Sequence, residues 1–445
     1  MFNFPEHLYT DVRIEDVFET AIVLINGDLQ DNKVRQYKGA FIRIFDGQRW
    51  YYSATSEVNN IQNEIDALAS LAKKNKDIYE HAIVKKLEVN KGEHYIFNEE
   101  SVREISHEKK EALAYKLLPM IKEVSEVKIH RVRYVDTNKI KYFYSSKGAN
   151  LSFDYQSTGV AVSLTLAEGD KNYNCFFQVP VNYFEDIKGL EELLKEKVEE
   201  GLFFLKNSKP VIPGDYTVIF SPHVAGVFAH ESFGHKSEAD FMIGDEAMKK
   251  AWAIGSKVGV DNLSIVDDGN IVASGYAPFD DEGNKGKKTY LIKDGILQER
   301  LHSTVTAEAL SEEITGNARA IDFKFEPIVR MTNTYIEAGK MTLEEMIKDI
   351  KEGILVKDMT HGSGMSTFTI APNLSYMIRD GKIAEPVSIS VISGDVMKTL
   401  YEIDGLTDGL SIISSITGGC GKGEQMPLPV GTGGPYVRIK KIKVQ

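Results

Sequence analysis

The sequence predicts an α+β protein of two domains. Residues 1–205 mix helical and strand-like hydrophobic patterns, and residues 213–445 are richer in glycine and in short β-type runs. A polar segment with two prolines and one glycine, residues 206–215, separates them. A chain of 445 residues is long enough for two domains. We therefore expect an N-terminal α/β domain over residues 1–205, with antiparallel strands and helices, and a C-terminal β-rich domain over residues 213–445.

The N-terminal elements follow from hydrophobic spacing. Two alternating, aromatic-rich runs surround Asp46-Gly47, a dipeptide typical of hairpin turns. Helical segments instead place apolar side chains three and four residues apart, and the last of them also pairs opposite charges at that spacing. The expected elements are a hairpin at 35–53, helices at 57–74, 109–127 and 183–205, and strands between 132 and 174.

The C-terminal region shows short strands separated by turns. Asp294-Gly295 and Asp380-Gly381 are again hairpin signals. The expected strands include 216–220, 289–292, 328–331 and 387–392. The most basic segment, residues 438–443, alternates charge with apolar residues and is typical of a solvated edge strand.

Charge and composition exclude several classes of function. With 53 basic and 65 acidic residues, the net charge is −12, which repels phosphate backbones and anionic lipids. No stretch approaches the ~18 apolar residues that span a bilayer, and the first residues lack a signal-peptide pattern. Two cysteines, Cys175 and Cys420, suit a reducing compartment. We expect a cytoplasmic protein that binds neither nucleic acid nor membranes.

Residues 229–235 read AHESFGH and carry the main chemical signal. His230, Glu231 and His235 are similar to the H-E-x-x-H motif of metalloproteases, but three residues rather than two follow the glutamate. Ser221 and Pro222 predict a helix start shortly before them. The residues between are nearly all apolar, so we expect a buried helix whose polar residues need partners. The alternative is a helix that ends in solvent.

The extra residue changes which side chains share a helix face. At ~100° per residue, Glu231 and His235 lie about 40° apart, but His230 and His235 lie about 140° apart. On an ideal helix the two imidazoles cannot bind one ion. A π-type turn would absorb the extra residue. Alternatively, the helix could end at Gly234, letting His235 swing back. Either device would give a variant metal site.

A zinc site needs a third protein ligand and, if catalytic, an open position for water. Cys420 lies in a glycine-rich loop, residues 417–423, and a thiolate is a good zinc ligand. A small buried thiol in a tight turn explains it equally well, and Cys175 is expected to be structural. The other candidates are His223, His302, His361 and several carboxylates.

Two segments stay outside the predicted site. One is the acidic cluster of Asp280, Asp281 and Glu282. It would either hold the ligands of a site or contact a substrate, or else form a solvent-exposed turn. His361 precedes a Ser/Thr-rich stretch and is expected at most to line a pocket.

Four motifs occur in the order of a known family: 230–235, 276–283, 327–335 and 418–423. They resemble the TldD/PmbA family, also labelled modulators of DNA gyrase, and the similarity extends over nearly the whole chain. The resemblance implies a barrel-like C-terminal domain that carries the metal-site helix. It also implies a homodimer, or a heterodimer with a family paralogue, that encloses a proteolytic chamber.

The same resemblance implies a zinc-type metallopeptidase that cleaves unfolded or leader peptides. His230, His235 and Cys420 match the family's metal ligands, and Glu231 matches the base that activates water at one divalent ion, expected to be zinc. The PmbA/TldE branch lacks the motif, so the active branch is favoured. The alternative is a non-catalytic assembly or peptide-binding subunit of the same family. The peptide, the cleavage mode, the native metal and the partner chain stay open.

Overall fold

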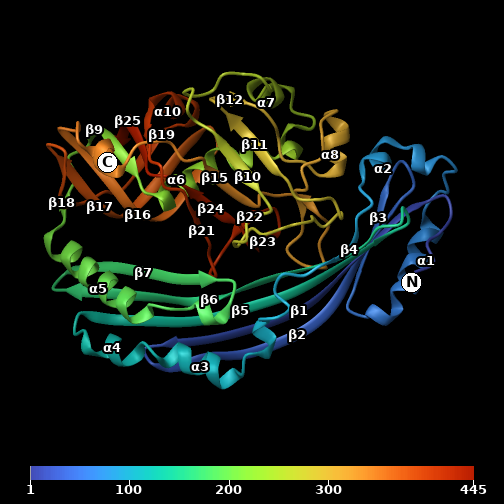
Figure 1. The fold of residues 1–445 in the computed structure, drawn as a ribbon, viewed down its shortest axis with the longest axis horizontal. Coiled ribbons are helices and arrows are strands. Elements are labelled where there is room, and N and C mark those ends of the chain that lie inside the picture. The colour runs from blue at the N-terminus through green and yellow to red at the C-terminus, as the bar shows by residue number, and fades with distance from the viewer. Residues whose placement is uncertain (1) are drawn as a thin grey trace.

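A computed structural model describes residues 2–445. It is 24% helix and 43% strand, which confirms the mixed class. Figure 1 shows two layers: a sheet of long strands from the N-terminal half, and the C-terminal half packed above it. Within residues 2–445, no helix has both the length and the apolar composition needed to cross a bilayer.

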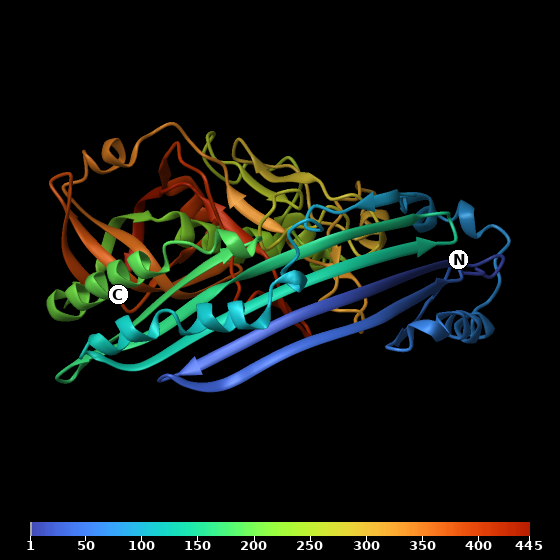
Figure 2. The same cartoon turned by 60° about the horizontal axis from the view of Figure 1, so that its bottom comes forward.

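The N-terminal sheet has seven strands in the order β3-β2-β1-β5-β6-β4, with β7 paired to β6. All its pairings are antiparallel except that of β4 with β6. Figure 2 shows the long strands running side by side. Their bounds are β1 (Tyr9–Ile25), β2 (Asp28–Phe45), β3 (Trp50–Thr55), β4 (Lys91–His94), β5 (Val127–Ser145), β6 (Asn150–Glu168) and β7 (Lys171–Val181).

The N-terminal helices pack against this sheet. The hairpin around Asp46-Gly47 joins β2 to β3, as predicted. The helix expected at 109–127 is instead two short helices, α3 and α4. With α5, they share one apolar cluster with β1, β5, β6 and β7. The bounds are α1 (Ile61–Leu71), α2 (Ala82–Lys86), α3 (His107–Tyr115), α4 (Leu118–Glu123) and α5 (Leu190–Asn207).

The C-terminal half contains a closed five-stranded barrel, in which each strand pairs with the next around the ring β16-β9-β25-β19-β17. This confirms the barrel-like expectation. Short strands β8, β18 and β20 extend its sheet. The bounds are β8 (Lys209–Pro210), β9 (Gly214–Phe220), β16 (Glu352–Gly364), β17 (Thr367–Arg379), β18 (Lys382–Ser388), β19 (Ile392–Asp395), β20 (Ile403–Leu406) and β25 (Val437–Val444).

The prediction of an edge strand at residues 438–443 is wrong. These residues lie in β25, which pairs with β9, β19 and β20. Arg438 is buried because Asp404 and Asp349 bind its guanidinium. The basic side chains of this strand form ion pairs or lie on the outer surface of the barrel, and the strand is not a sheet edge.

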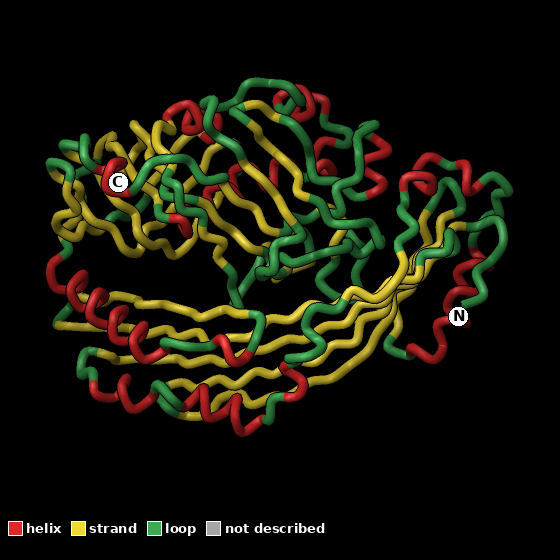
Figure 3. Tube along the Cα trace, in the orientation of Figure 1, coloured by secondary structure: helices red, strands yellow, loops and turns green. Residues whose placement is uncertain are grey.

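A second C-terminal sheet has the order β12-β11-β10-β15-β24-β21, and two small hairpin-like sheets accompany it. Figure 3 shows that loops connect much of this region. The bounds are β10 (Ile265–Asp268), β11 (Lys288–Lys293), β12 (Ile296–Leu297), β13 (Ala318–Arg319), β14 (Ile328–Val329), β15 (Asn333–Ile336), β21 (Ser411–Ile413), β22 (Cys420–Lys422), β23 (Gln425–Leu428) and β24 (Gly431–Gly434). The helices are α6 (Pro222–Ala229), α7 (Glu246–Ala251), α8 (Thr304–Ala309), α9 (Leu343–Ile347) and α10 (Val396–Glu402).

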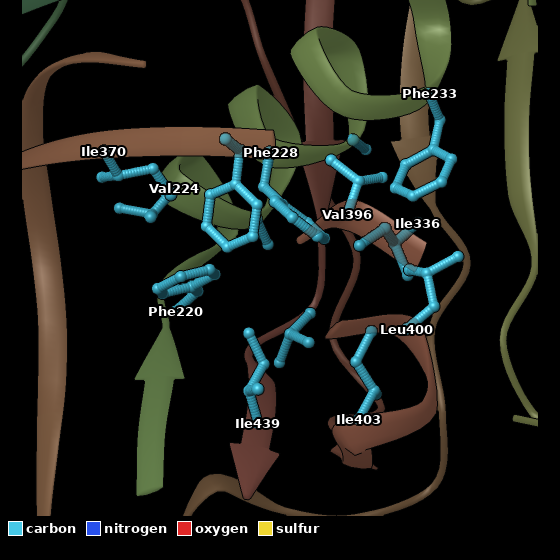
Figure 4. Packing of buried hydrophobic residues seen from close by; sticks show 14 of the residues in the cluster. Phe220, Val224, Phe228, Phe233, Ile336, Ile370, Val396, Leu400, Ile403 and Ile439 are labelled. Carbon is cyan, nitrogen blue, oxygen red and sulfur yellow. The ribbon is translucent and has the colours of Figure 1, made fainter. Parts of the chain in front are cut away.

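Helix α6 lies in the main core, between the barrel and the second sheet. Figure 4 shows Val224 and Phe228 among side chains from both. Gly226 leaves no room for a Cβ, because the backbone of Gly433 on β24 is too close. The apolar stripe expected before the motif is therefore a core contact, and it fixes the direction in which the chain enters residues 230–235.

Asp280, Asp281 and Glu282 do not form a solvent-exposed turn: all three are buried. Asp281 pairs with Lys141 on β5 at 2.5 Å, and Glu282 pairs with Arg43 on β2 at 2.8 Å. The acidic cluster therefore joins the C-terminal half to the N-terminal sheet. Clusters of acidic residues usually form solvent-exposed turns. Here cations from distant strands offset the desolvation cost of the buried carboxylates.

Candidate metal centre

The helix that leads to the motif begins as the sequence predicts. Ser221 is the N-cap of α6, and its Oγ accepts a hydrogen bond from the Val224 N–H at 3.4 Å. Pro222 occupies the first helical position, where a missing N–H has no cost. Helix α6 ends at Ala229, and the His230 N–H still donates to the Gly226 carbonyl four residues back.

A π-helical turn spans His230–Gly234. The His235 N–H donates to the His230 carbonyl, five residues back, so one extra residue fits into the turn. The two imidazole rings consequently lie 5.1 Å apart between centroids, at 79°. Of the two devices that the sequence left open, the structure contains the π-type turn.

Gly234 serves this turn through its size and not as a helix end. Its φ of −54° is ordinary helical backbone. A Cβ at this position would overlap the Sδ atom of Met331, which is fully buried. Glycine is therefore required because the turn packs directly on the segment that precedes β15.

Cys420 arrives from the β22–β23 hairpin, in which it pairs with Leu428. The fully buried Arg330 holds both strands: its guanidinium donates to the carbonyls of Cys420 at 2.7 Å and of Gln425 at 3.1 Å. The glycine-rich loop before Cys420 lets these strands come close, since a Cβ at Gly419 would overlap the Leu428 carbonyl.

The structure brings His230, His235 and Cys420 together. One ligand atom from each lies within 4.8 Å of the other two, and Cys420 Sγ is 3.4 Å from His235 Nε2. His230 and Cys420 are buried. Within residues 2–445, the buried His230 Nδ1 has no hydrogen-bond partner. Two imidazoles and one thiol are a donor set that zinc prefers, so the residues present fit such an ion.

The electrostatics favour a thiolate. Burial would raise the pKa of the Cys420 thiol, but the imidazoles of His230 and His235 lower it to about 4. Burial would likewise lower the pKa of His235, but hydrogen bonds with Cys420 and Glu238 raise it to about 10. The thiolate is the form of cysteine that binds metals, so the side chain is ready for that role.

The other histidine candidates lie in different surroundings. His223 contacts Asp358 through Nδ1 at 3.0 Å. His302 is buried between Thr306 and Glu312. His361 is exposed on β16. Among residues 2–445, the cluster with ligand spacing contains only His230, His235 and Cys420.

Glu231 lies in the π turn, next to His230, and is half-buried. Within the described residues, no hydrogen bond or ion pair holds its carboxylate. Its carboxylate is therefore not engaged by another side chain.

Sequence reasoning missed three residues that support the site. Arg330 lies inside the 327–335 motif, but nothing in the pattern links it to Cys420. Lys422 and Glu238 form an ion pair at 3.1 Å that joins the hairpin to the segment after the motif. A glutamate three residues after His235 was the available signal, because residues at that spacing contact each other.

A cavity of about 570 Å³ is lined by residues of both the N-terminal sheet and the C-terminal half. Its walls include Lys139 and Tyr155 on the sheet side, and Gly418 and Leu428 on the other. Leu428 is the residue opposite Cys420 in the hairpin, so the cavity adjoins the segment that carries the thiol.

Comparisons with known proteins show which family this chain resembles. The sequence profile of the PmbA/TldA metallopeptidase C-terminal domain matches residues 213–445, and that of the PmbA/TldA metallopeptidase domain 1 matches residues 10–76. A metalloprotease of Synechocystis sp. is 34% identical, over 77% of this chain and 74% of its own length. A zinc metalloprotease TldD homolog of Saccharolobus solfataricus is 28% identical, over 98% of this chain and 96% of its own.

The fold has solved relatives as well. The crystal structure of TldE from Thermococcus kodakarensis superimposes with a TM-score of 0.77 at 16% identity, covering 98% of this chain and 96% of that one. From the domain profiles and the curated relatives together, the chain belongs to the PmbA/TldD family of metallopeptidases and is a peptide hydrolase.

Proposed function

We propose that this chain is a TldD-like zinc metallopeptidase whose single metal ion is held by His230, His235 and Cys420. The observation that carries the proposal is the convergence of three ligand atoms within 4.8 Å from segments 185 residues apart. A relative that covers nearly the whole chain is named a zinc metalloprotease, which supports zinc as the ion.

A zinc ion bound there would act as a Lewis acid on the scissile carbonyl and would make water a better nucleophile. Glu231 accepts the proton that the attacking water loses, and transfers it to the amine nitrogen as the C–N bond breaks. Its half-buried position and unpaired carboxylate suit this exchange between water and substrate. His230 and His235 stay in place because the π turn and the core contacts of α6 fix their backbone.

The substrate is an unfolded or leader peptide in extended form. Strand β21 ends the second sheet and is partly exposed, and it lies a few residues before the Cys420 hairpin. Such an edge binds an extended peptide through backbone hydrogen bonds, with little dependence on its side chains. The cavity beside the hairpin provides space for a chain of this kind.

The working assembly is a cytoplasmic dimer that encloses the site in a chamber, formed with a second copy or with a family paralogue. The fold shared with TldE supports a paralogous partner. A chamber would restrict cleavage to peptides that can enter as extended chains.

The test is Glu231→Gln, assayed by cleavage of an unstructured peptide and by zinc content. Glutamine has nearly the same shape but cannot accept the proton, so the cleavage rate should fall at least about 100-fold, with one zinc retained per chain. Glu344→Gln, at an exposed carboxyl on α9, is the control and should change neither quantity. Cleavage by Glu231→Gln at the rate of the control would refute Glu231 as the base.

A further inference from the structure

Glu238 is fully buried immediately after the motif. A short 3₁₀ turn, His235–Ser237, places it where its Oε2 atom is 3.1 Å from His235 Nδ1. The same oxygen is 3.1 Å from Lys422 Nζ. One carboxylate oxygen therefore contacts both the imidazole of a proposed ligand and an ammonium from another element.

Lys422 follows Cys420 by two residues on β22. Besides Glu238, its ammonium contacts Asp240 Oδ1 at 2.7 Å and donates to the Val329 carbonyl at 2.9 Å. It also lies 4.5 Å from the ring centre of Phe241. These contacts fasten the hairpin that carries Cys420 to the segment that carries His235.

We propose that Glu238 and Lys422 are positioning residues that hold His235 and Cys420 in ligand geometry. The inference rests on the proposed function, because it assumes that these two side chains bind the metal. Glu238 accepts a hydrogen bond from Nδ1–H of His235, which fixes the tautomer whose free nitrogen is Nε2. Nε2 is the atom that faces Cys420 Sγ, at 3.4 Å. Lys422 binds the same carboxylate oxygen and lies on the strand of Cys420. It therefore holds the thiolate in a fixed position relative to that imidazole.

A general structural role explains this pair less well. An ion pair removed from water gains little over apolar packing of the same volume, so burial alone gives no reason for it. Within residues 2–445, Glu238 Oε1 has no hydrogen-bond partner, whereas Oε2 has both polar contacts of this carboxylate. Its contacts are instead directed at His235 and at the Cys420 hairpin.

The experiment measures the zinc dissociation constant of the full-length protein by competition with a chelator. Carboxylates that orient metal-binding histidines typically contribute about 10- to 100-fold in affinity. Glu238→Gln and Lys422→Met should each weaken zinc binding by about tenfold or more, whereas Lys422→Arg should restore most of it. Asp154→Asn is the matched control: this buried carboxyl accepts N–H bonds from Ile96 and Phe97 and should leave the affinity unchanged.

A second readout separates positioning from general stability. In Co²⁺-loaded protein, Glu238→Gln should shift the visible d–d absorption bands, because the imidazole bound to the ion changes orientation and basicity. Asp154→Asn should leave the spectrum unchanged even if it lowers the melting temperature. The inference fails if zinc affinity and Co²⁺ spectrum match wild type in both Glu238→Gln and Lys422→Met.

The outcomes also distinguish this inference from the proposed function. If wild type and Cys420→Ser bind zinc equally, the proposed ligand set is wrong. If only the Glu238 and Lys422 variants match wild type, the ligand set stands and the positioning role is wrong. Should Glu238→Gln not fold, Lys422→Met and Lys422→Arg decide: weakening by the first alone supports the role, and wild-type affinity in both overturns it.

Discussion

Neighbouring residues set the position of Cys420 and the protonation state of its thiol. Arg330 fixes the backbone on both strands of the Cys420 hairpin. The two imidazoles keep the pKa of Cys420 low despite burial. The arrangement of the three proposed ligands therefore depends on neighbouring residues as well as on the ligands themselves.

Replacing Cys420 with serine tests the third ligand. A hydroxyl is a much poorer zinc donor than a thiolate, so zinc content after dialysis against a weak chelator should fall at least about tenfold. Cys175→Ser is the matched control, because Cys175 is also buried but lies in the N-terminal core, where its Sγ donates to the Lys197 carbonyl at 3.5 Å, away from any cluster with ligand spacing in residues 2–445. Equal zinc content in the two variants would place the third ligand elsewhere.

The sequence was sufficient to nominate these three residues but not their supports. Imidazole and thiolate have few common roles, so their spacing is informative. Lysine, arginine and glutamate are usually on the surface, and Arg330 and Lys422 gain their roles only from contacts with segments about 90 to 185 residues away. Glu238 had a local signal, its place three residues after His235, but nothing in the sequence indicated its pairing with Lys422. Such contacts leave no local pattern.

Among the secondary-structure elements, the π turn determines how the two imidazoles of the proposed site lie relative to each other. In a regular helix the two imidazoles would point about 140° apart, but the π turn accommodates one extra residue and brings them to the same side. The turn is held by α6 on one side and by Met331 beneath Gly234. A regular continuation of α6 would send the two imidazoles in different directions.

Gly234→Ala should destabilise this turn. The added Cβ overlaps Met331 Sδ, and a crowded core typically loses about 1–3 kcal/mol in the free energy of unfolding. Urea denaturation measures the change. Gly409→Ala is the control, because a Cβ there meets nothing within 4 Å. A loss no greater than in the control would show that the packing on Met331 is looser than described.

Several elements were predictable because their patterns are local. The hairpin around Asp46-Gly47 and the helices α1 and α5 occur where periodicity placed them. The helix expected at 109–127 divides at residues 116–117, between α3 and α4, a break that tertiary packing imposes. Strand β1 was not anticipated at all. In β25, pairing on both sides overrides an alternating charge pattern that is typical of an edge.

At the scale of the whole molecule, a buried charge cluster joins the two layers. Asp281 lies beside Lys141 and Arg13, which come from β5 and β1 of the N-terminal sheet. Burial would raise the pKa of Asp281, but Lys141 and Arg13 lower it below its usual value. The domain arrangement could not be predicted, because the acidic segment and its cations are about 140 and 270 residues apart.

This pairing predicts how stability depends on pH. Because the pKa of Asp281 is lower in the folded state than its unfolded value near 4, the folded state prefers the carboxylate. Its contribution is therefore present above about pH 4 and is lost as the pH falls further. Asp281→Asn should cost about 3 kcal/mol in the free energy of unfolding at pH 7, since it leaves buried cations unpaired.

Urea titrations from pH 7 to pH 3 measure this difference. The gap between wild type and Asp281→Asn should be constant near neutrality and should narrow in acid. Asp186→Asn, in an exposed pair with Lys188, should change stability by less than about 1 kcal/mol throughout. A gap that widens below pH 4 would contradict the assigned direction of the pKa.

The proposed function requires that His230, His235 and Cys420 bind one zinc ion. Anomalous diffraction at the zinc absorption edge, from crystals of the zinc-loaded protein, tests it most directly. We expect one strong peak, from an ion within bonding distance of a nitrogen of each imidazole and of the Cys420 sulfur. A strong peak bonded to other residues, with Cys420 outside its coordination sphere, would contradict it.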